Sequence, residues 1–244
     1  MPPRAYTRVA VAQLACQPAI ALPGRAPFED PLFDLARADA LRPEGEPPSE
    51  LDTRFNELRE RIARVHREQL LLKVQAILGQ CQQWGVRLIV FPEYSLPWQV
   101  LEQVARAGGD LVIVAGTHSV TRPARQSGVY ERLGAQPAAL GQAVCPVLHR
   151  GRLLGLQPKL SLTEMEQELR PGQAWRPIPL EALPGPMGVL ICLDFLHREG
   201  EAHRKLVAEA LEQSHFLAVP SYTPFHTIPE FHTTTTPALK RMWA

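Results

Sequence analysis

The sequence predicts an α/β domain, because short apolar runs alternate along the chain with segments of helical spacing. Its 244 residues are 45% apolar, which is enough for one substantial core. We therefore expect a single domain over residues 1–244. Buried strands are expected at 7–14, 86–91, 111–117, 143–149, 152–156, 188–192 and 215–219, with a further short strand at 129–133.

The spacing of apolar residues also predicts the helices between these strands. From 53 to 83 apolar residues recur at helical intervals, and charged pairs such as Glu57 and Arg61 share the opposite face. The same reasoning predicts helices over 98–107 and 201–213. Residues of about 18–52 show no period and are rich in Pro, Gly and acidic residues, so we expect an irregular insertion there.

Charge and cysteine usage narrow the functional class. Lys plus Arg number 26 and Asp plus Glu number 25, which gives a net charge of +1. The chain therefore lacks the excess of positive charge that is typical of proteins that bind nucleic acid or an anionic membrane. The four cysteines lack the paired spacing of a disulfide framework or zinc site. The N-terminus lacks the pattern of a signal peptide, and no apolar run approaches the ~20 residues that span a bilayer. We expect a cytoplasmic protein acting on a small molecule.

Three chemically complementary residues follow or end predicted strands. Cys192 ends the apolar run 188–192, Glu93 follows the strand 86–91, and Lys159 is an isolated lysine between them. A free thiol with a pKa of about 8.5 is mostly protonated at neutral pH, although its thiolate is the reactive form. Glu93 is suited to remove the thiol proton as general base. Lys159 is suited to favour the thiolate and, with the backbone N–H of Leu193, to stabilise an oxyanion.

In their order along the chain these residues resemble the nitrilase, or carbon–nitrogen hydrolase, family. Each motif alone is weak, but together they are fairly specific. The resemblance implies a four-layer α-β-β-α sandwich, a cysteine thioester intermediate, and chemistry without cofactor or metal. It rests on Phe91-Pro92-Glu93, Lys159 with Leu160 and Leu162, Cys192-Leu193-Asp194, the strand-like segment 216–221, and an opening strand that carries Gln13.

The family also uses a second glutamate shortly after the lysine, which orients substrate or the attacking water. Here Glu164, Glu166 and Glu168 are candidates, of which we favour Glu166 by its distance from Lys159, with Glu164 as the alternative. Adjacency to the motifs makes Tyr94, Leu193, Phe195 and Ser221 the expected substrate-binding residues.

Two features depart from the family pattern. After Cys192 the chain reads Leu-Asp-Phe-Leu-His-Arg-Glu, where the family often has an aromatic residue, an arginine or a Pro-Glu pair. Family members continue past the segment equivalent to 237–244 into further strands, so we expect the last strands of the sandwich to be lacking. An uncovered sheet edge favours association. We therefore expect a homodimer or higher oligomer, or a partner chain that completes the sheet.

These observations predict hydrolysis of a non-peptide carbon–nitrogen bond in a small amide or carbamoyl compound. Hydrolysis of a nitrile and transfer of the acyl group to an amine use the same three residues and stay open. A different class of function is a catalytically dormant, nitrilase-like interaction module of a larger assembly. Eight histidines also leave open a Cys-His hydrolase of another fold.

Overall fold

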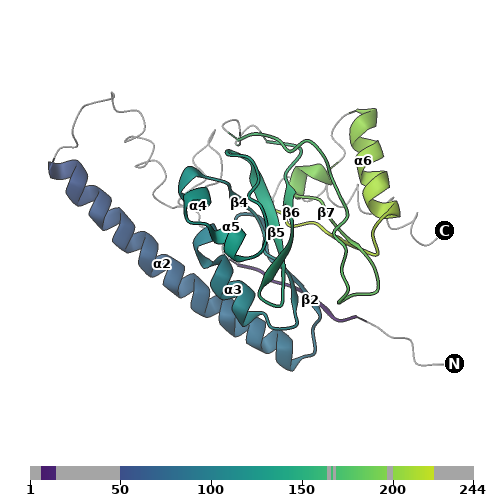
Figure 1. Ribbon diagram of the computed structural model, residues 1–244, viewed down its shortest axis with the longest axis horizontal. Coiled ribbons are helices and arrows are strands. Elements are labelled where there is room, and N and C mark those ends of the chain that lie inside the picture. The colour runs from purple at the N-terminus through teal and green to yellow at the C-terminus, as the bar shows by residue number, and fades with distance from the viewer. Residues whose placement is uncertain (1–6, 15–49, 164–165, 167–168, 197–199, 223–244) are drawn as a thin grey trace.

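The computed structural model describes residues 7–14, 50–163, 166, 169–196 and 200–222 (Figure 1). Strands and helices alternate, as the sequence predicts for an α/β chain. In order they are β1 (Val9–Val11), α2 (Glu50–Gln83), β2 (Leu88–Val90), a 3₁₀ turn (Trp98–Val100), α3 (Leu101–Ala107), β3 (Val112–Val114), β4 (His118–Ser119), α4 (Arg122–Gln126), α5 (Val129–Arg132), β5 (Ala143–His149), β6 (Arg152–Pro158), β7 (Met187–Val189), a 3₁₀ turn (Cys192–Asp194), α6 (Glu201–Glu212) and β8 (Phe216–Ala218).

The strands form two sheets. In the larger sheet β1, β2 and β3 are parallel neighbours, β5 pairs with β3 in the antiparallel direction, and β4 and β6 pair with β5. In the described part of the chain the second sheet holds β7 and β8, which are parallel. Residues 223–244, where the sequence analysis placed the end of the sandwich, lie outside the described residues.

Three apolar cores separate four layers. Along β2, Ile89 packs toward α2 and α3, whereas its neighbour Leu88 packs toward the second sheet. Successive side chains of a strand point to opposite faces, so one apolar run supplies both cores. Leu190 contributes to a third core with Val207 of α6. The layer order is therefore helices α2 and α3, large sheet, small sheet, α6, which confirms the expected α-β-β-α sandwich (Figure 1).

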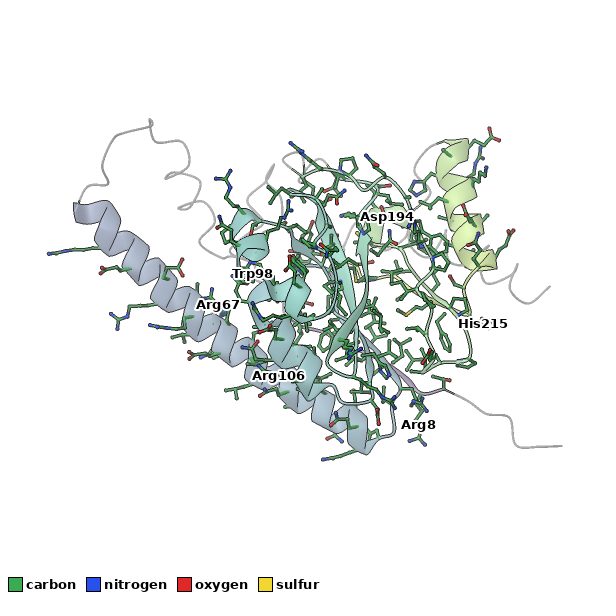
Figure 2. All side chains as sticks on the ribbon, viewed as in Figure 1. Arg8, Arg67, Trp98, Arg106, Asp194 and His215 are labelled. Atoms are coloured by element: carbon green, nitrogen blue, oxygen red, sulfur yellow. The ribbon has the colours of Figure 1, made fainter. Side chains whose placement is uncertain are left out.

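Helix α2 shows how the apolar pattern fixes a layer. Val74, Leu78 and Cys81 lie on one face and are buried in the core beneath the large sheet. Side chains along the other side project away from the sheet (Figure 2). The helix begins at Glu50, so the last residues assigned to the irregular insertion are helical. Residues 18–49 of that predicted insertion lie outside the described residues.

The strand predicted at 129–133 is wrong, because this segment forms helix α5. Its buried residues are Val129, Tyr130 and Leu133, a spacing that suits one face of a helix as well as a short strand. Gly128, with φ of 69°, turns the chain into the helix. Val and Tyr favour strands in isolation, but packing in the helical core decides the conformation here.

Cys81 and Cys145 are buried free thiols, whereas Cys16 lies outside the described residues. Within the described ranges, no helix has the length and hydropathy needed to cross a membrane.

The two faces of α2 provide a matched stability test. Leu78 is fully buried and Leu72 is 68% exposed. We expect Leu78→Ala to lower the free energy of unfolding by about 2–5 kcal/mol, because it leaves a cavity in the helix–sheet core. Leu72→Ala should stay within about 0.5 kcal/mol of the parent. Urea denaturation measures both, and equal losses would contradict the helix–sheet packing described here.

Candidate active site

The turn after β2 places Glu93 in the space between the two sheets. Phe91 continues the strand by donating its N–H to Val114. Tyr94 then adopts a left-handed conformation with φ of 55°, and its N–H donates to Thr117 Oγ1 at 2.9 Å. Gly116 allows the two loops to approach, since a Cβ there would lie 2.0 Å from the carbonyl oxygen of Pro92. Glu93 is 2% exposed as a result.

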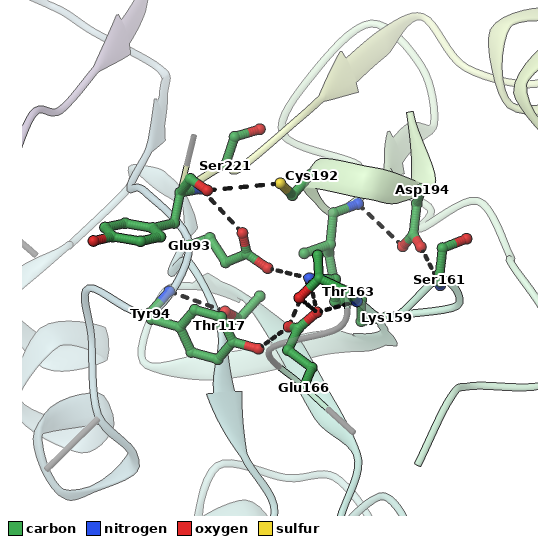
Figure 3. A network of polar contacts seen from close by, with 12 residues as sticks. Glu93, Tyr94, Thr117, Lys159, Ser161, Thr163, Glu166, Cys192, Asp194 and Ser221 are labelled. Carbon is green, nitrogen blue, oxygen red and sulfur yellow. Dashed lines mark hydrogen bonds and ion pairs between the residues drawn. The ribbon is translucent and has the colours of Figure 1, made fainter. Parts of the chain in front are cut away.

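Lys159 follows β6 and carries a buried ammonium group between two carboxylates. Its backbone N–H donates to Ala143 at 2.9 Å, which continues the pairing of β6 with β5. The side chain is 1% exposed. Lys159 Nζ lies 2.7 Å from Glu93 Oε1 and 2.7 Å from both carboxylate oxygens of Glu166 (Figure 3). The structure therefore brings together three of the candidate residues, Glu93, Lys159 and Glu166.

Glu166 is held by donors on both of its oxygens. Besides Lys159, its carboxylate accepts from the Tyr94 hydroxyl, and from the N–H and Oγ1 of Thr163 at 2.8 and 2.9 Å. Glu164, the alternative second glutamate, lies outside the described residues. With this many donors already bound, the Glu166 carboxylate is suited to fix Lys159 in place rather than to bind substrate.

Cys192 begins a 3₁₀ turn after β7 and has a left-handed conformation with φ of 47°. Its N–H donates to Pro220 at 3.0 Å. The Sγ atom lies 3.9 Å from the carbonyl oxygen of Tyr222, whose N–H donates to Glu93 Oε2 at 3.0 Å (Figure 3). One peptide segment therefore contacts both the thiol and the carboxylate.

Burial and neighbouring charges set the protonation of the cluster. Burial acts to lower the pKa of Lys159, but Glu93 and Glu166 outweigh it and raise that pKa. Burial acts to raise the pKa of Glu166, but Lys159 outweighs it, so the net shift is downward. For Glu93, burial and the negative charge of Glu166 raise the pKa more than Lys159 lowers it.

The thiol of Cys192 is protonated in the resting site. Burial raises its pKa, and the charge of Glu93 together with a hydrogen bond to that side chain raises it further. Lys159 acts in the opposite direction but does not compensate. The arrangement is therefore a neutral thiol beside a carboxylate that can accept its proton, not a preformed thiolate.

Comparisons with known proteins identify the fold of this chain. No protein-family model and no curated protein matches the sequence. The solved structure of Nit3 from Saccharomyces cerevisiae, described as a member of branch 10 of the nitrilase superfamily, superimposes with a TM-score of 0.52 at 17% identity. The chain has the fold of the nitrilase superfamily. The match covers 70% of this chain and 65% of Nit3, so the chain spans less than two thirds of that protein.

Two further solved structures are similar to the chain. An amidase from Nesterenkonia sp. matches with a TM-score of 0.49 at 14% identity, over 70% of this chain and 67% of the amidase. Glutamine-dependent NAD⁺ synthetase from Acinetobacter baumannii matches with a TM-score of 0.49 at 15% identity, over 70% of this chain and 32% of the synthetase.

The four expected substrate-binding residues occupy different places in this nitrilase fold. Tyr94 reaches the cluster and binds Glu166. Leu193 follows the thiol in the 3₁₀ turn, where the first N–H groups of a helix lack partners within the helix. Phe195 packs in the core between the small sheet and α6. Ser221 donates its hydroxyl to Val219 at 3.2 Å.

Several contacts of the site could not be foreseen from the sequence. Thr117, Thr163 and the backbone of Tyr222 each bind a member of the cluster or its flanking turn. A backbone N–H is present in every residue except proline, so the residue type does not predict which N–H becomes a donor in the site. Asp194, buried two residues after the thiol, was visible only as part of the Cys-Leu-Asp motif.

The surroundings of the described histidines and acidic residues bear on two alternatives, a Cys-His pair and a metal site. The charged groups that chiefly shift the pKa of Cys192 are Glu93, Lys159 and Glu166. His118 binds the hydroxyl of Tyr130 at 2.8 Å, and burial lowers its pKa to about 3. In the same part of the chain, no group of three or more His, Cys, Asp or Glu side chains is arranged to hold a metal ion.

The charges around the thiol lead to a direct test. Glu93→Gln removes a negative charge next to Cys192, so we expect the thiol pKa to fall. Lys159→Met removes the opposing positive charge, so it should rise. The pH dependence of iodoacetamide labelling of Cys192, followed by peptide mass spectrometry with Cys81 and Cys145 as internal references, measures both shifts. An unchanged or higher thiol pKa in Glu93→Gln would contradict the proposed contact between these two side chains.

Proposed function

We propose that the protein hydrolyses a non-peptide carbon–nitrogen bond in a small amide or carbamoyl compound through a thioester on Cys192. The observation that carries this proposal is the buried Lys159 ammonium, held 2.7 Å from both Glu93 and Glu166, with the Cys192 thiol beside Glu93. A base, a nucleophile and a cation are thereby concentrated in one buried space. This combination suits acyl transfer.

In the first half of the reaction, Glu93 accepts the thiol proton as the Cys192 sulfur attacks the substrate carbonyl carbon. The carbon–sulfur bond forms while the carbonyl π electrons move to oxygen. As the tetrahedral intermediate collapses, the carbon–nitrogen bond breaks and Glu93 returns the proton to the leaving nitrogen. Ammonia or an amine departs, and the acyl group remains on sulfur. Because the resting thiol is neutral, proton transfer accompanies the attack.

Negative charge on the substrate oxygen is stabilised by Lys159 and by the N–H of Leu193. The ammonium has three N–H bonds. One reaches Glu93, and a single bifurcated N–H can serve both oxygens of Glu166, so the remaining one can donate to the oxyanion. Loss of one such donor typically costs about 10²–10³ in rate. Glu166 contributes by keeping the ammonium charged and in place.

In the second half, a water molecule replaces the departed amine. Glu93 removes a proton from the water as its oxygen attacks the thioester carbon. The second tetrahedral intermediate then collapses with cleavage of the carbon–sulfur bond, and Glu93 protonates the sulfur. The products are a carboxylic acid and the free enzyme, so no cofactor is consumed. If an amine takes the place of water, the same steps transfer the acyl group.

The finer aspects of this function stay predictions. They are the choice of amide, carbamoyl or nitrile substrate, a cytoplasmic location and a homo-oligomeric state. A partner chain that completes the second sheet is a further prediction. The dormant interaction module is the competing account, and it predicts the same fold without turnover.

The raised pKa of Glu93 predicts the pH dependence of turnover. Glu93 must be ionised to accept a proton, so kcat/KM should rise as pH increases through its pKa, above the ordinary glutamate value of about 4.3. The raised pKa of Lys159 keeps the ammonium charged well into the alkaline range. Glu166→Gln should move the acid limb to lower pH, because it removes a like charge from beside Glu93.

The measurement is ammonia or amine release from a panel of simple amides, carbamoyl compounds and nitriles. Cys192→Ala should abolish it, and Glu93→Gln should lower it by on the order of 10²–10⁴. Cys81→Ala is the matched control, because that thiol lies in the helix–sheet core, and it should retain parental turnover. Turnover that persists in Cys192→Ala, or no turnover of any panel member by the folded parent, would refute the proposal.

A further inference from the structure

The nucleophile turn contains a second buried carboxylate that the reaction itself does not use. Asp194 is fully buried. Its Oδ1 accepts from the N–H of Ser161 at 2.6 Å and of Leu160 at 3.0 Å, and its Oδ2 accepts from Leu160 at 3.2 Å and from Ile191 at 3.2 Å. Figure 3 shows this carboxylate facing Ser161, on the side of the turn away from Glu93.

These donors belong to two segments that are distant in the sequence. Leu160 and Ser161 directly follow Lys159, whereas Ile191 directly precedes Cys192. One carboxylate therefore joins the backbone that carries the cation to the backbone that carries the nucleophile. Backbone N–H groups are also fixed in direction by the chain, so bonds to them define position more tightly than bonds to flexible side chains.

Asp194 also closes the backbone turn that contains Cys192. Its side chain accepts from the N–H of Ile191, and its own N–H donates to the carbonyl of Ile191 at 2.9 Å. Cys192 lies between these residues in the left-handed conformation, which L side chains rarely adopt. The paired bonds hold the turn closed around that residue. They also fix the orientation of the Cys192 side chain relative to the backbone.

We propose that Asp194 is a positioning residue that sets the Cys192 turn against the Lys159 segment, an inference that rests on the proposed function of this site. It acts through the backbone, since its oxygens bind N–H groups on both segments. Its effect is the relative placement of thiol, carboxylate and ammonium. A misplacement of about 1 Å in such a constellation can cost on the order of 10² in rate.

Asp194→Asn tests this role, because the amide keeps the size of the side chain but replaces one acceptor oxygen with a donor. Burial raises the pKa of Asp194 to about 7 despite its N–H donors, so the assays belong above that pH, where the parent carboxylate is ionised. We expect kcat to fall by on the order of 10², with a smaller change in KM, and the pH dependence of iodoacetamide labelling of Cys192 to change because the thiol moves relative to Glu93. Asp110→Asn, at an exposed aspartate paired with Arg150, is the matched control and should match the parent.

Hydrogen exchange of the backbone separates positioning from general stability. In Asp194→Asn, the amides of Leu160, Ser161 and Ile191 should exchange faster, while the buried half of α2 keeps its protection. Asp194→Glu retains the carboxylate and should recover part of the rate, and it serves as the test if Asp194→Asn does not fold. A kcat within about threefold of the parent in folded Asp194→Asn would overturn the inference, since misplacement of the groups predicts a loss on the order of 10².

Failure of this inference is distinguishable from failure of the proposed function. If the parent labels Cys192 and turns over an amide but Asp194→Asn does so equally well, only the positioning role is wrong. A lower melting temperature with unchanged labelling and kcat would give Asp194 a structural role alone, which also overturns the inference. If the parent itself neither turns over an amide nor labels at Cys192, the proposed function is wrong and the positioning role fails with it.

Discussion

The site depends on one buried ion cluster, the Lys159 ammonium between the carboxylates of Glu93 and Glu166. A charge removed from water costs several kcal/mol unless it is paired, and removing one partner of such a pair typically destabilises a protein by about 3–5 kcal/mol. Glu93 follows β2, whereas Lys159 and Glu166 lie in the connection between β6 and β7, and the three charges compensate only when these two segments meet. The four-layer fold therefore has to form before the cluster can be stable.

Burial and the negative charge of two carboxylates against one ammonium together explain the state of the thiol. Burial is the main cause that raises the pKa of Glu93 and of Cys192, and a neighbouring carboxylate raises each pKa further, so the proposed base is able to accept a proton and the proposed nucleophile keeps its own until substrate arrives. A protonated buried thiol is also less prone to alkylation or oxidation than a thiolate.

The backbone around the site is also strained. Left-handed residues such as Tyr94 and Cys192 cost of order 1–3 kcal/mol each, and the surrounding hydrogen bonds hold them in that conformation.

Patterns along the chain predicted the alternation of strands and helices, and the resemblance to the nitrilase family implied the four layers and the candidate site residues. Apolar runs that end at Glu93 and Cys192 mark the ends of buried strands, and ends of neighbouring strands meet in space. Helical spacing predicted α2 and α6, but over the short stretch of α5 the same residues fit a strand. Phe195 was expected at the site from adjacency to the motif, and it packs in the core beneath α6 because the chain turns after Cys192. Contacts made by backbone groups, such as the hydrogen bond from the N–H of Tyr222 to Glu93, depend on how distant segments pack, so residue type alone does not predict them.

The central claim is that Cys192 carries the acyl group during turnover. The most direct measurement is to mix the protein with an amide that it hydrolyses, quench in acid within the first turnovers, and locate added mass by intact and peptide mass spectrometry. The account predicts a mass increase equal to the acyl group on the peptide that contains Cys192, removable by hydroxylamine and absent from Cys192→Ala. An acyl group on another residue, or hydrolysis that continues in Cys192→Ala, would contradict it.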